Sequence, residues 1–154
     1  MPSPDITLAA ARPEPIPEVS GWLWREWGIR RGRTQNDVAA LLAARVAPQG
    51  PEQTFVLLDG GQPAATASLV HHDLDPRPDL SPWLASVYVH PPFRGRGHAP
   101  RVVGAVEASA RAAGIATLYL DTNTAAPLYA RLGWVAFAES TDLGAIVTLM
   151  RRDL

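Results

Sequence analysis

The stretch VYVHPPFRGRGHAPRVV, residues 87–103, joins three different local patterns and decides the fold. Its first residues favour a β-strand, and Pro91-Pro92 ends that strand because a proline cannot donate to a sheet ladder and restricts the residue before it. Two glycines follow, and valines at helical spacing come after Pro100, which a first helical turn tolerates. We therefore expect a strand, a glycine-rich turn and a helix in direct succession.

A turn of this kind can bind phosphate. Its backbone N–H groups point one way, and the dipole of the following helix adds partial positive charge. Gly95 and Gly97 allow close approach of a ligand, while Arg94 and Arg96 can add charge and bidentate hydrogen bonds. The pattern matches neither a P-loop, which needs a lysine that this chain lacks, nor a dinucleotide fingerprint, which needs a third glycine. The alternative is a turn that only redirects the chain.

Hydrophobic periodicity on both sides of this stretch predicts the other elements. Thr34 is a candidate N-cap for a helix whose expected apolar face is Val38, Leu41, Leu42 and Val46. The turn Asp59-Gly60-Gly61 predicts a hairpin, and the helix after the glycine-rich turn has an expected apolar face of Val102, Val103, Val106 and Ala110. The predicted strands are 5–10, two within 53–73, 83–90, 115–122, 134–140 and 145–152, and the predicted helices are 19–29, 34–47, 100–114 and 126–133.

The resulting order, β-α-α-β-β-β-α-β-α-β-β, predicts an α/β fold with one mixed sheet. The central strand–helix–strand crossover requires parallel strands, whereas the strands before it form an antiparallel meander. We expect helices on both faces of the sheet and a single domain over residues 1–154, a usual length for one core.

Composition limits the classes of function. The net charge of -1 argues against a general nucleic-acid binder, and the lack of cysteine excludes disulfides, thiolate metal sites and cysteine nucleophiles. No apolar run approaches the ~18 residues of a membrane span, and the first residues lack the features of a signal peptide. Arginine without lysine is typical of a GC-rich genome. We expect a bacterial, cytoplasmic protein that binds no metal, no nucleic acid and no membrane.

The glycine-rich turn resembles motif A of the GNAT superfamily, the acyl-CoA-dependent N-acetyltransferases. That motif is (Arg/Gln)-x-x-Gly-x-(Gly/Ala), and here it runs Arg94-Gly95-Arg96-Gly97-His98-Ala99. A second segment, TNTAAPLYARLGW (122–134), resembles the family's motif B through Asn123, Ala126, Tyr129, Gly133 and Trp134. The predicted element order is also similar to the GNAT fold over nearly the whole chain.

The resemblance implies that acetyl-CoA is the cosubstrate. The fourth and fifth strands of the family splay apart, which would leave backbone groups near Val87, Tyr88 and Val89 free to pair with the pantetheine arm. The amides of residues 94–99 would hold the pyrophosphate, although Pro100 stands where relatives usually keep an N–H. His98 is expected either near phosphate or as a solvent-facing loop residue. Asn123 would contact the pantetheine or order the local backbone, and a helix cap is its structural alternative.

The resemblance also implies that Tyr129 is the general acid that protonates the departing thiolate; a core tyrosine is the alternative. The general base stays open, because the strand WLASVYV offers no carboxylate or imidazole. His72 is the candidate that we select, since a histidine titrates near neutrality and only one of two adjacent strand residues can face the active side. His71, Glu26, Asp79 and solvent are the other options. The tryptophans Trp22, Trp24, Trp27 and Trp83 either line an acceptor cleft or pack in the core.

The expected function is direct transfer of an acetyl group from acetyl-CoA to a primary amine of a small molecule, in a ternary complex. Two alternatives remain: a non-catalytic acyl-CoA-binding or sensing module on the same fold, and a phosphate- or nucleotide-binding protein that uses the Gly-Arg turn. Relatives often form dimers, and the sheet edge formed by the last strands could pair in a homodimer.

Overall fold

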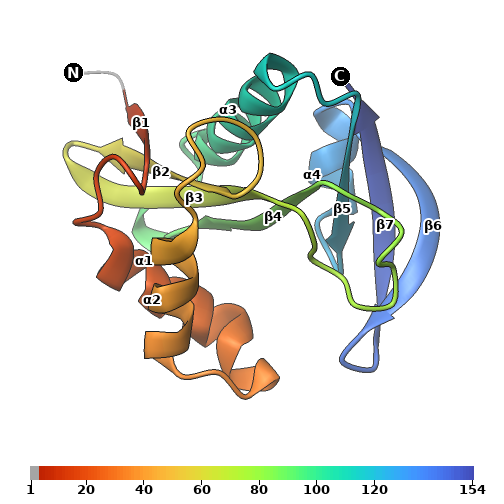
Figure 1. The fold of residues 1–154 in the computed structure, drawn as a ribbon, viewed down its shortest axis with the longest axis horizontal. Coiled ribbons are helices and arrows are strands. Elements are labelled where there is room, and N and C mark those ends of the chain that lie inside the picture. The colour runs from red at the N-terminus through yellow and green to blue at the C-terminus, as the bar shows by residue number, and fades with distance from the viewer. Residues whose placement is uncertain (1–3) are drawn as a thin grey trace.

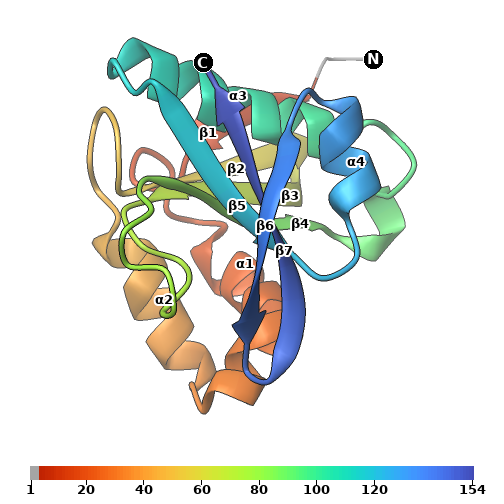
Figure 2. The same ribbon diagram turned by 90° about the vertical axis from the view of Figure 1, so that its right-hand side faces the viewer.

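The structure, a computed structural model, describes residues 4–154 and contains one seven-stranded sheet with helices on both faces (Figures 1 and 2). The strand order is β1-β2-β3-β4-β5-β7-β6. The strands are β1 (Asp5–Leu8), β2 (Gln53–Asp59), β3 (Gln62–Val70), β4 (Trp83–Val89), β5 (Thr117–Thr122), β6 (Val135–Asp142) and β7 (Ala145–Asp153). The main helices are α1 (Ile16–Leu23), α2 (Gln35–Ala44), α3 (His98–Ala112) and α4 (Ala126–Arg131). The predicted element order and mixed α/β class are confirmed.

All neighbouring strands are antiparallel except the central pair, in which β4 and β5 run parallel. The crossover between these two strands contains α3, as the sequence pattern required. Gly60 and Gly61 both have positive φ and form the predicted tight turn between β2 and β3. In Figure 1 the strands β1–β4 and the strands β5–β7 form two differently inclined halves of the sheet.

Helix α3 covers one face of the sheet with the four residues that the pattern predicted. Val102, Val103, Val106 and Ala110 are all buried, and they pack with side chains of β3 such as Ala65 and Leu69. Burying a valine side chain contributes about 1.5–3 kcal/mol, so this face is a main source of stability. The helix begins at His98, two residues before the predicted start, because the first turn accepts a proline at its third position.

Helices α1 and α2 cover the opposite face. α1 begins at Ile16, three residues before the predicted start, because Pro17 fits the first helical turn. A π-helical turn, Trp24–Gly28, and a 3-10 turn, Ile29–Arg31, continue it to Gly32, whose left-handed backbone (φ 71°) ends the helix as expected.

Helix α2 starts as predicted but ends early. The Thr34 hydroxyl accepts a hydrogen bond from the amide of Asp37, and the Asp37 carboxylate accepts one from the amide of Thr34, which completes a capping box. The helix stops at Ala44, because Arg45 turns inward and donates to Thr54 and Ser68 of the sheet.

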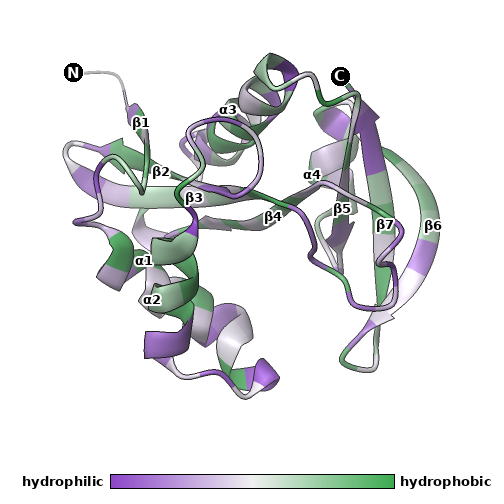
Figure 3. Cartoon of the chain, in the orientation of Figure 1, coloured by the Kyte–Doolittle hydropathy of each residue, from purple (hydrophilic) through white to green (hydrophobic). Residues whose placement is uncertain are grey.

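The predicted apolar face of α2 is therefore only half right. Val38 and Leu42 are buried, whereas Leu41 is 39% exposed and Val46, which lies beyond the end of the helix, is 65% exposed. Figure 3 shows how apolar residues gather along the central strands and on the inner helix surfaces. No helix between residues 4 and 154 is long and apolar enough to cross a membrane.

Candidate active site

The central sheet opens between β4 and β5. These strands pair only at Trp83 and Tyr119, and no further register pair joins them within residues 4–154. Ser86 has a left-handed backbone (φ 55°) and lies beside a bulge in the β3–β4 ladder, where a bulged strand bends. The splayed central strands that the sequence predicted are therefore present.

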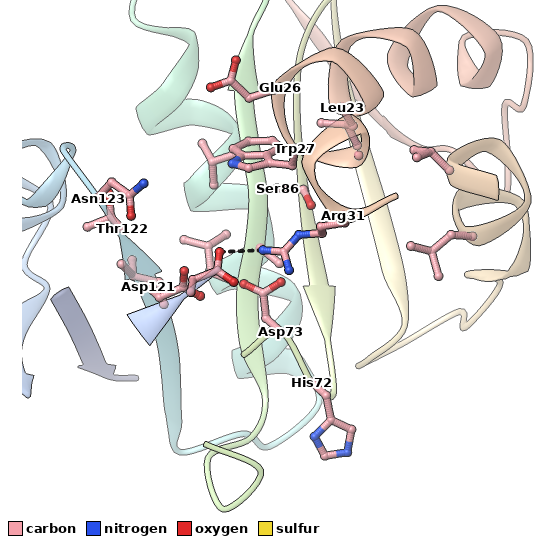
Figure 4. A pocket seen from close by; sticks show the side chains of 18 of the residues that line it. Leu23, Glu26, Trp27, Arg31, His72, Asp73, Ser86, Asp121, Thr122 and Asn123 are labelled. Atoms are coloured by element: carbon pink, nitrogen blue, oxygen red, sulfur yellow. Dashed lines mark hydrogen bonds and ion pairs between the residues drawn. The ribbon is translucent and has the colours of Figure 1, made fainter. Parts of the chain in front are cut away.

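A cleft of about 700 Å³ lies at this opening (Figure 4). Its lining comes from segments that are far apart in the sequence: the α1–α2 region, the β3–β4 loop, β4, the end of β5 with α4, and the β6–β7 turn. Such a convergence of polar and apolar side chains is typical of a ligand-binding site.

One edge of β4 is open to a ligand. The other edge pairs with β3, where Val89 lies opposite Ala65. Towards β5 the backbone of Val87, Tyr88 and Val89 has no strand partner in the described part of the chain, and Val87 lines the cleft. An extended molecule that carries amides can pair with such an edge.

The glycine-rich turn leads from β4 into α3. Gly95 (φ 80°) and Gly97 (φ 76°) have left-handed backbones, which other residues adopt only with strain. A Cβ atom on either glycine would meet nothing within 4 Å, so space is open beside the turn. The free N–H groups of His98 and Ala99 begin a 15-residue helix, and Pro100 lacks an N–H. The turn therefore offers an anion open space and backbone N–H donors, although Pro100 supplies no N–H.

The arginines of the turn are held by the protein itself. Nε of Arg94 donates to the carbonyl of Val89 over 3.0 Å, and its guanidinium lies 5.6 Å from the centre of the Tyr88 ring. A terminal nitrogen of Arg96 donates to Asp59 over 3.1 Å. Both side chains remain exposed, so they can add positive charge near an anion while these contacts limit the motion of the turn.

His98 is buried, which makes the expectation of a solvent-facing loop residue wrong. Its side chain is 2% exposed, and Nε2 lies 2.9 Å from Oδ2 of Asp59, because the start of α3 directs it toward the β2–β3 hairpin. The hydrogen bond from His98 is the main reason why the pKa of Asp59 is lowered. Asp59 thus supports the turn, a role that the sequence analysis, which used it only as a hairpin signal, did not identify.

Tyr129 lies on α4 with its side chain only 7% exposed. Its ring makes an edge contact with Trp134, at 6.3 Å between centres. Burial, and secondarily the charge of Asp121, raises the pKa of Tyr129 to about 12, so the phenol is protonated at neutral pH. Tyr129 lines the cleft, and its hydroxyl has no hydrogen-bond partner within residues 4–154.

Thr122, the last residue of β5, and Asn123, which follows it, have different contacts. The Thr122 hydroxyl accepts a hydrogen bond from the amide of Ala125 over 3.0 Å and so orders the turn into the helix. Asn123 is exposed and lines the cleft beside Thr122 (Figure 4). The hydrogen bond that orders this turn is therefore made by Thr122, and the side chain of Asn123 makes no hydrogen bond within residues 4–154.

The candidate bases have different surroundings. His72 and Glu26 both line the cleft, but Figure 4 shows the ring of His72 directed away from the other labelled side chains and Glu26 at the opposite end. His71 is exposed, and its backbone amide donates to Glu52. Asp79 lies outside this cleft and accepts two hydrogen bonds from Arg77, at 3.0 and 2.8 Å.

The structure adds acidic groups that the sequence analysis missed. Asp73, Asp121 and Asp142 come from three separate segments and line the same cleft. Figure 4 shows Asp73 and Asp121 near Arg31. Arg31 and Asp142 form an ion pair of 2.6 Å. Within residues 4–154 no group of three or more His, Asp or Glu side chains is arranged to hold a metal ion.

The tryptophans are divided between the core and the cleft. Trp22 and Trp83 are buried in two different clusters of the core. Trp27 is half-buried and lines the cleft, whereas the indole nitrogen of Trp24 donates to the carbonyl of Arg33 over 2.9 Å. Of these four tryptophans, Trp27 lines the cleft.

Comparisons with solved structures identify the fold. An acetyltransferase of the GNAT family from Streptococcus pneumoniae superposes with a TM-score of 0.73 and 17% identity, over 99% of each chain. An aminoglycoside 6'-N-acetyltransferase complexed with coenzyme A gives a TM-score of 0.75 at 13% identity, over 97% of this chain and 96% of that one. The protein yncA from Salmonella typhimurium, solved with its cofactor acetyl-CoA, gives 0.72 at 20% identity, over 99% and 94%.

At these identities the structural likeness shows the fold alone. No match is found among the curated proteins. The profile of the acetyltransferase (GNAT) family matches residues 16–134, which include both motifs and the splayed strands. This chain belongs to the acetyltransferase (GNAT) family.

Proposed function

We propose that the protein transfers an acetyl group from acetyl-CoA to a primary amine of a small molecule. The observation that carries this proposal is the position of Tyr129, whose protonated and unpartnered hydroxyl lies at the cleft where β4 and β5 separate. A proton donor is needed there because a thiolate leaves when the acetyl group is transferred.

The residues around the opening fit acetyl-CoA. The turn at residues 94–99 has open space and helix N-terminal donors for a diphosphate, and the free edge at Val87, Tyr88 and Val89 suits the amides of pantetheine. Asn123 is placed to add a hydrogen bond at the mouth of the cleft. Acetyl-CoA supplies the activated acetyl thioester, and the chain supplies binding, orientation and the proton of Tyr129.

The acceptor side of the cleft favours a cationic molecule. Asp142 neutralises Arg31, while Glu26, Asp73 and Asp121 line the cleft and form no ion pair with a cation among residues 4–154. The half-buried ring of Trp27 adds an aromatic face that attracts a cation. A small amine that is charged in solution matches this lining.

Binding is tested first, because it separates this function from the two alternatives. Acetyl-CoA is expected to raise the melting temperature of the protein, whereas ATP and NAD at equal concentration are not. Stabilisation by ATP or NAD instead of acetyl-CoA would favour a protein that uses the turn for other phosphates.

Transfer is then measured by the release of free thiol from acetyl-CoA in the presence of amines, amino acids and peptides. Thiol release that requires a particular amine supports the enzyme. Tight binding of acetyl-CoA with no transfer to any class of amine supports a non-catalytic sensing module.

A further inference from the structure

In the described part of the chain, two carboxyl groups of the cleft form no ion pair. Asp121 is on β5 and Asp73 is in the β3–β4 loop, and Figure 4 shows both side chains directed into the cleft near Arg31. The Arg31 guanidinium is bonded to the third carboxylate, Asp142, at 2.6 Å. Neither Asp73 nor Asp121 forms an ion pair within residues 4–154, although Arg31 and Arg45 act on the pair through their charge.

One oxygen of this pair is buried without a partner. Oδ2 of Asp121 is inaccessible to solvent and receives no hydrogen bond in the described part of the chain. An ionised oxygen in that position would be costly, because burial penalises charge and no donor offsets it. A single proton shared with Asp73 satisfies the oxygen, since a protonated carboxyl group becomes a donor to its neighbour.

The surroundings favour this shared proton. Burial and the charge of Asp73 raise the pKa of Asp121 to about 8. Desolvation by the surrounding protein atoms likewise raises the pKa of Asp73, although the residue as a whole is exposed at the surface. The other charged groups that act on the pair are Asp142, which disfavours a second negative charge, and Arg31 and Arg45, which favour ionisation.

A second feature shows that the pair faces a ligand site. Tyr129 lines the same cleft, and its side chain is more than nine-tenths buried while its hydroxyl has no partner within residues 4–154. The charge of Asp121 acts on Tyr129, so the two groups are neighbours. An acid that stays protonated and a carboxyl pair that holds one proton therefore line the same cleft, as a transfer reaction requires.

We propose that Asp73 and Asp121 act together as the general base, taking a proton from the ammonium group of the acceptor amine. This inference rests on the proposed acetyl transfer and names the residues that prepare its nucleophile. A pair with one proton and one negative charge also attracts the cationic amine before deprotonating it. Such coupled groups titrate as a unit, so the base is the pair and neither residue alone.

The proton balance of the step is complete. The pair accepts one proton from the ammonium, and the free electron pair of the nitrogen forms a bond to the carbonyl carbon of the thioester. The carbon–sulfur bond breaks, its electrons remain on sulfur, and the sulfur takes the proton of Tyr129. The second proton of the nitrogen returns through water to the tyrosinate, and the pair releases its own proton to solvent. The products are an amide, free CoA and one proton.

The test uses Asp121→Asn and Asp73→Asn in the full chain, with Asp79→Asn as the control. Asn has nearly the same shape as Asp, and Asp79 is a carboxylate of the same loop that lies outside the cleft. We expect each cleft variant to lower kcat/KM for a basic amine by roughly 10²-fold or more, as loss of a general base does. The affinity for acetyl-CoA should stay unchanged, and the control should resemble the wild type.

Two readouts separate a base from a merely structural residue. The wild-type rate should fall on the acidic side of its pH profile as the pair becomes fully protonated, and this limb should shift or vanish in Asp121→Asn. The loss should also shrink for a weakly basic amine that is already neutral at the assay pH, because such an acceptor needs no base.

Thermal unfolding tests the shared proton without any acceptor. An acid whose pKa is raised in the folded state stabilises the fold at low pH, and that stability is lost as pH rises from about 4 toward about 8. The melting temperature of Asp121→Asn should show a smaller decline, because only the raised pKa of Asp73 remains.

Each outcome has a distinct meaning. Wild-type activity that Asp121→Asn and Asp73→Asn retain, or parallel melting curves of wild type and Asp121→Asn across pH, would overturn the inference while leaving acetyl transfer intact. A wild type that binds acetyl-CoA but acetylates no amine would overturn the proposed function, and the inference with it.

Discussion

Replacing Tyr129 with phenylalanine removes one hydroxyl from the cleft and nothing else. The hydroxyl has no partner within residues 4–154, so its loss breaks no internal hydrogen bond, and the ring keeps its edge contact with Trp134. We expect the free energy of unfolding to change by less than about 0.5 kcal/mol. A positioned general acid contributes about 10²–10⁴-fold, which corresponds to about 2.7–5.4 kcal/mol in the barrier.

The assay measures thiol release at saturating acetyl-CoA, together with acetyl-CoA affinity by titration calorimetry. We expect kcat to fall by at least about 10²-fold in Tyr129→Phe, with affinity within about twofold of the wild type. Because the pKa of Tyr129 is raised to about 12, no loss of the acid should appear in the wild-type profile below about pH 10.

The matched control is Tyr119→Phe. Tyr119 lies on β5. Its ring contacts those of Trp83 and Phe137, in a different cluster of the core from Tyr129. This variant should keep wild-type kcat. A kcat of Tyr129→Phe within threefold of the wild type would refute the assignment of the acid, and solvent would then protonate the thiolate.

Four further predictions concern the scaffold. Thr34→Ala removes half of the capping box and should lower the free energy of unfolding by about 1 kcal/mol, seen as a melting temperature reduced by about 2–4 °C; an unchanged value would mean that the cap contributes nothing. Gly133→Ala should cost about 1–3 kcal/mol, because φ is 94° and the new Cβ would collide with the Arg152 guanidinium; urea unfolding measures it, and a neutral result contradicts the geometry. His98→Ala should weaken acetyl-CoA binding roughly tenfold by releasing Asp59 from the turn, and calorimetry with equal affinity would argue against that support. Light scattering should find a dimer that Ile146→Glu dissociates, since this side chain is 68% exposed beside the edge strand; a monomeric wild type would exclude it.

The contiguous parts of the site could be predicted from the sequence. The glycine-rich turn, the start of α3 and the Tyr129 segment each lie within a few residues, so local rules of strand ends, positive φ and helix starts apply to them. The predicted core face of α3 was correct in all four residues for the same reason, because helical periodicity is a local property.

Such local rules could not predict polar contacts between segments that are distant in the sequence. Asp59 and His98 are 39 residues apart, and Arg31 and Asp142 are 111 residues apart, yet each pair is in contact. The predicted end of α2 was wrong for the same reason. Arg45 turns inward to donate to hydroxyl groups on β2 and β3, and the apolar periodicity of the helix contains no information about these contacts.

By itself the sequence determined the order of elements, the family motifs and the positions of the turn and Tyr129, because short-range backbone preferences and apolar periodicity encode them. Only the tertiary structure decided that Asp73 and Asp121 share one cleft, and that a buried oxygen there lacks a partner. The physical reason is that a carboxyl group's pKa and role depend on the charges and the amount of water around it, and these are set by which segments the splayed sheet brings together.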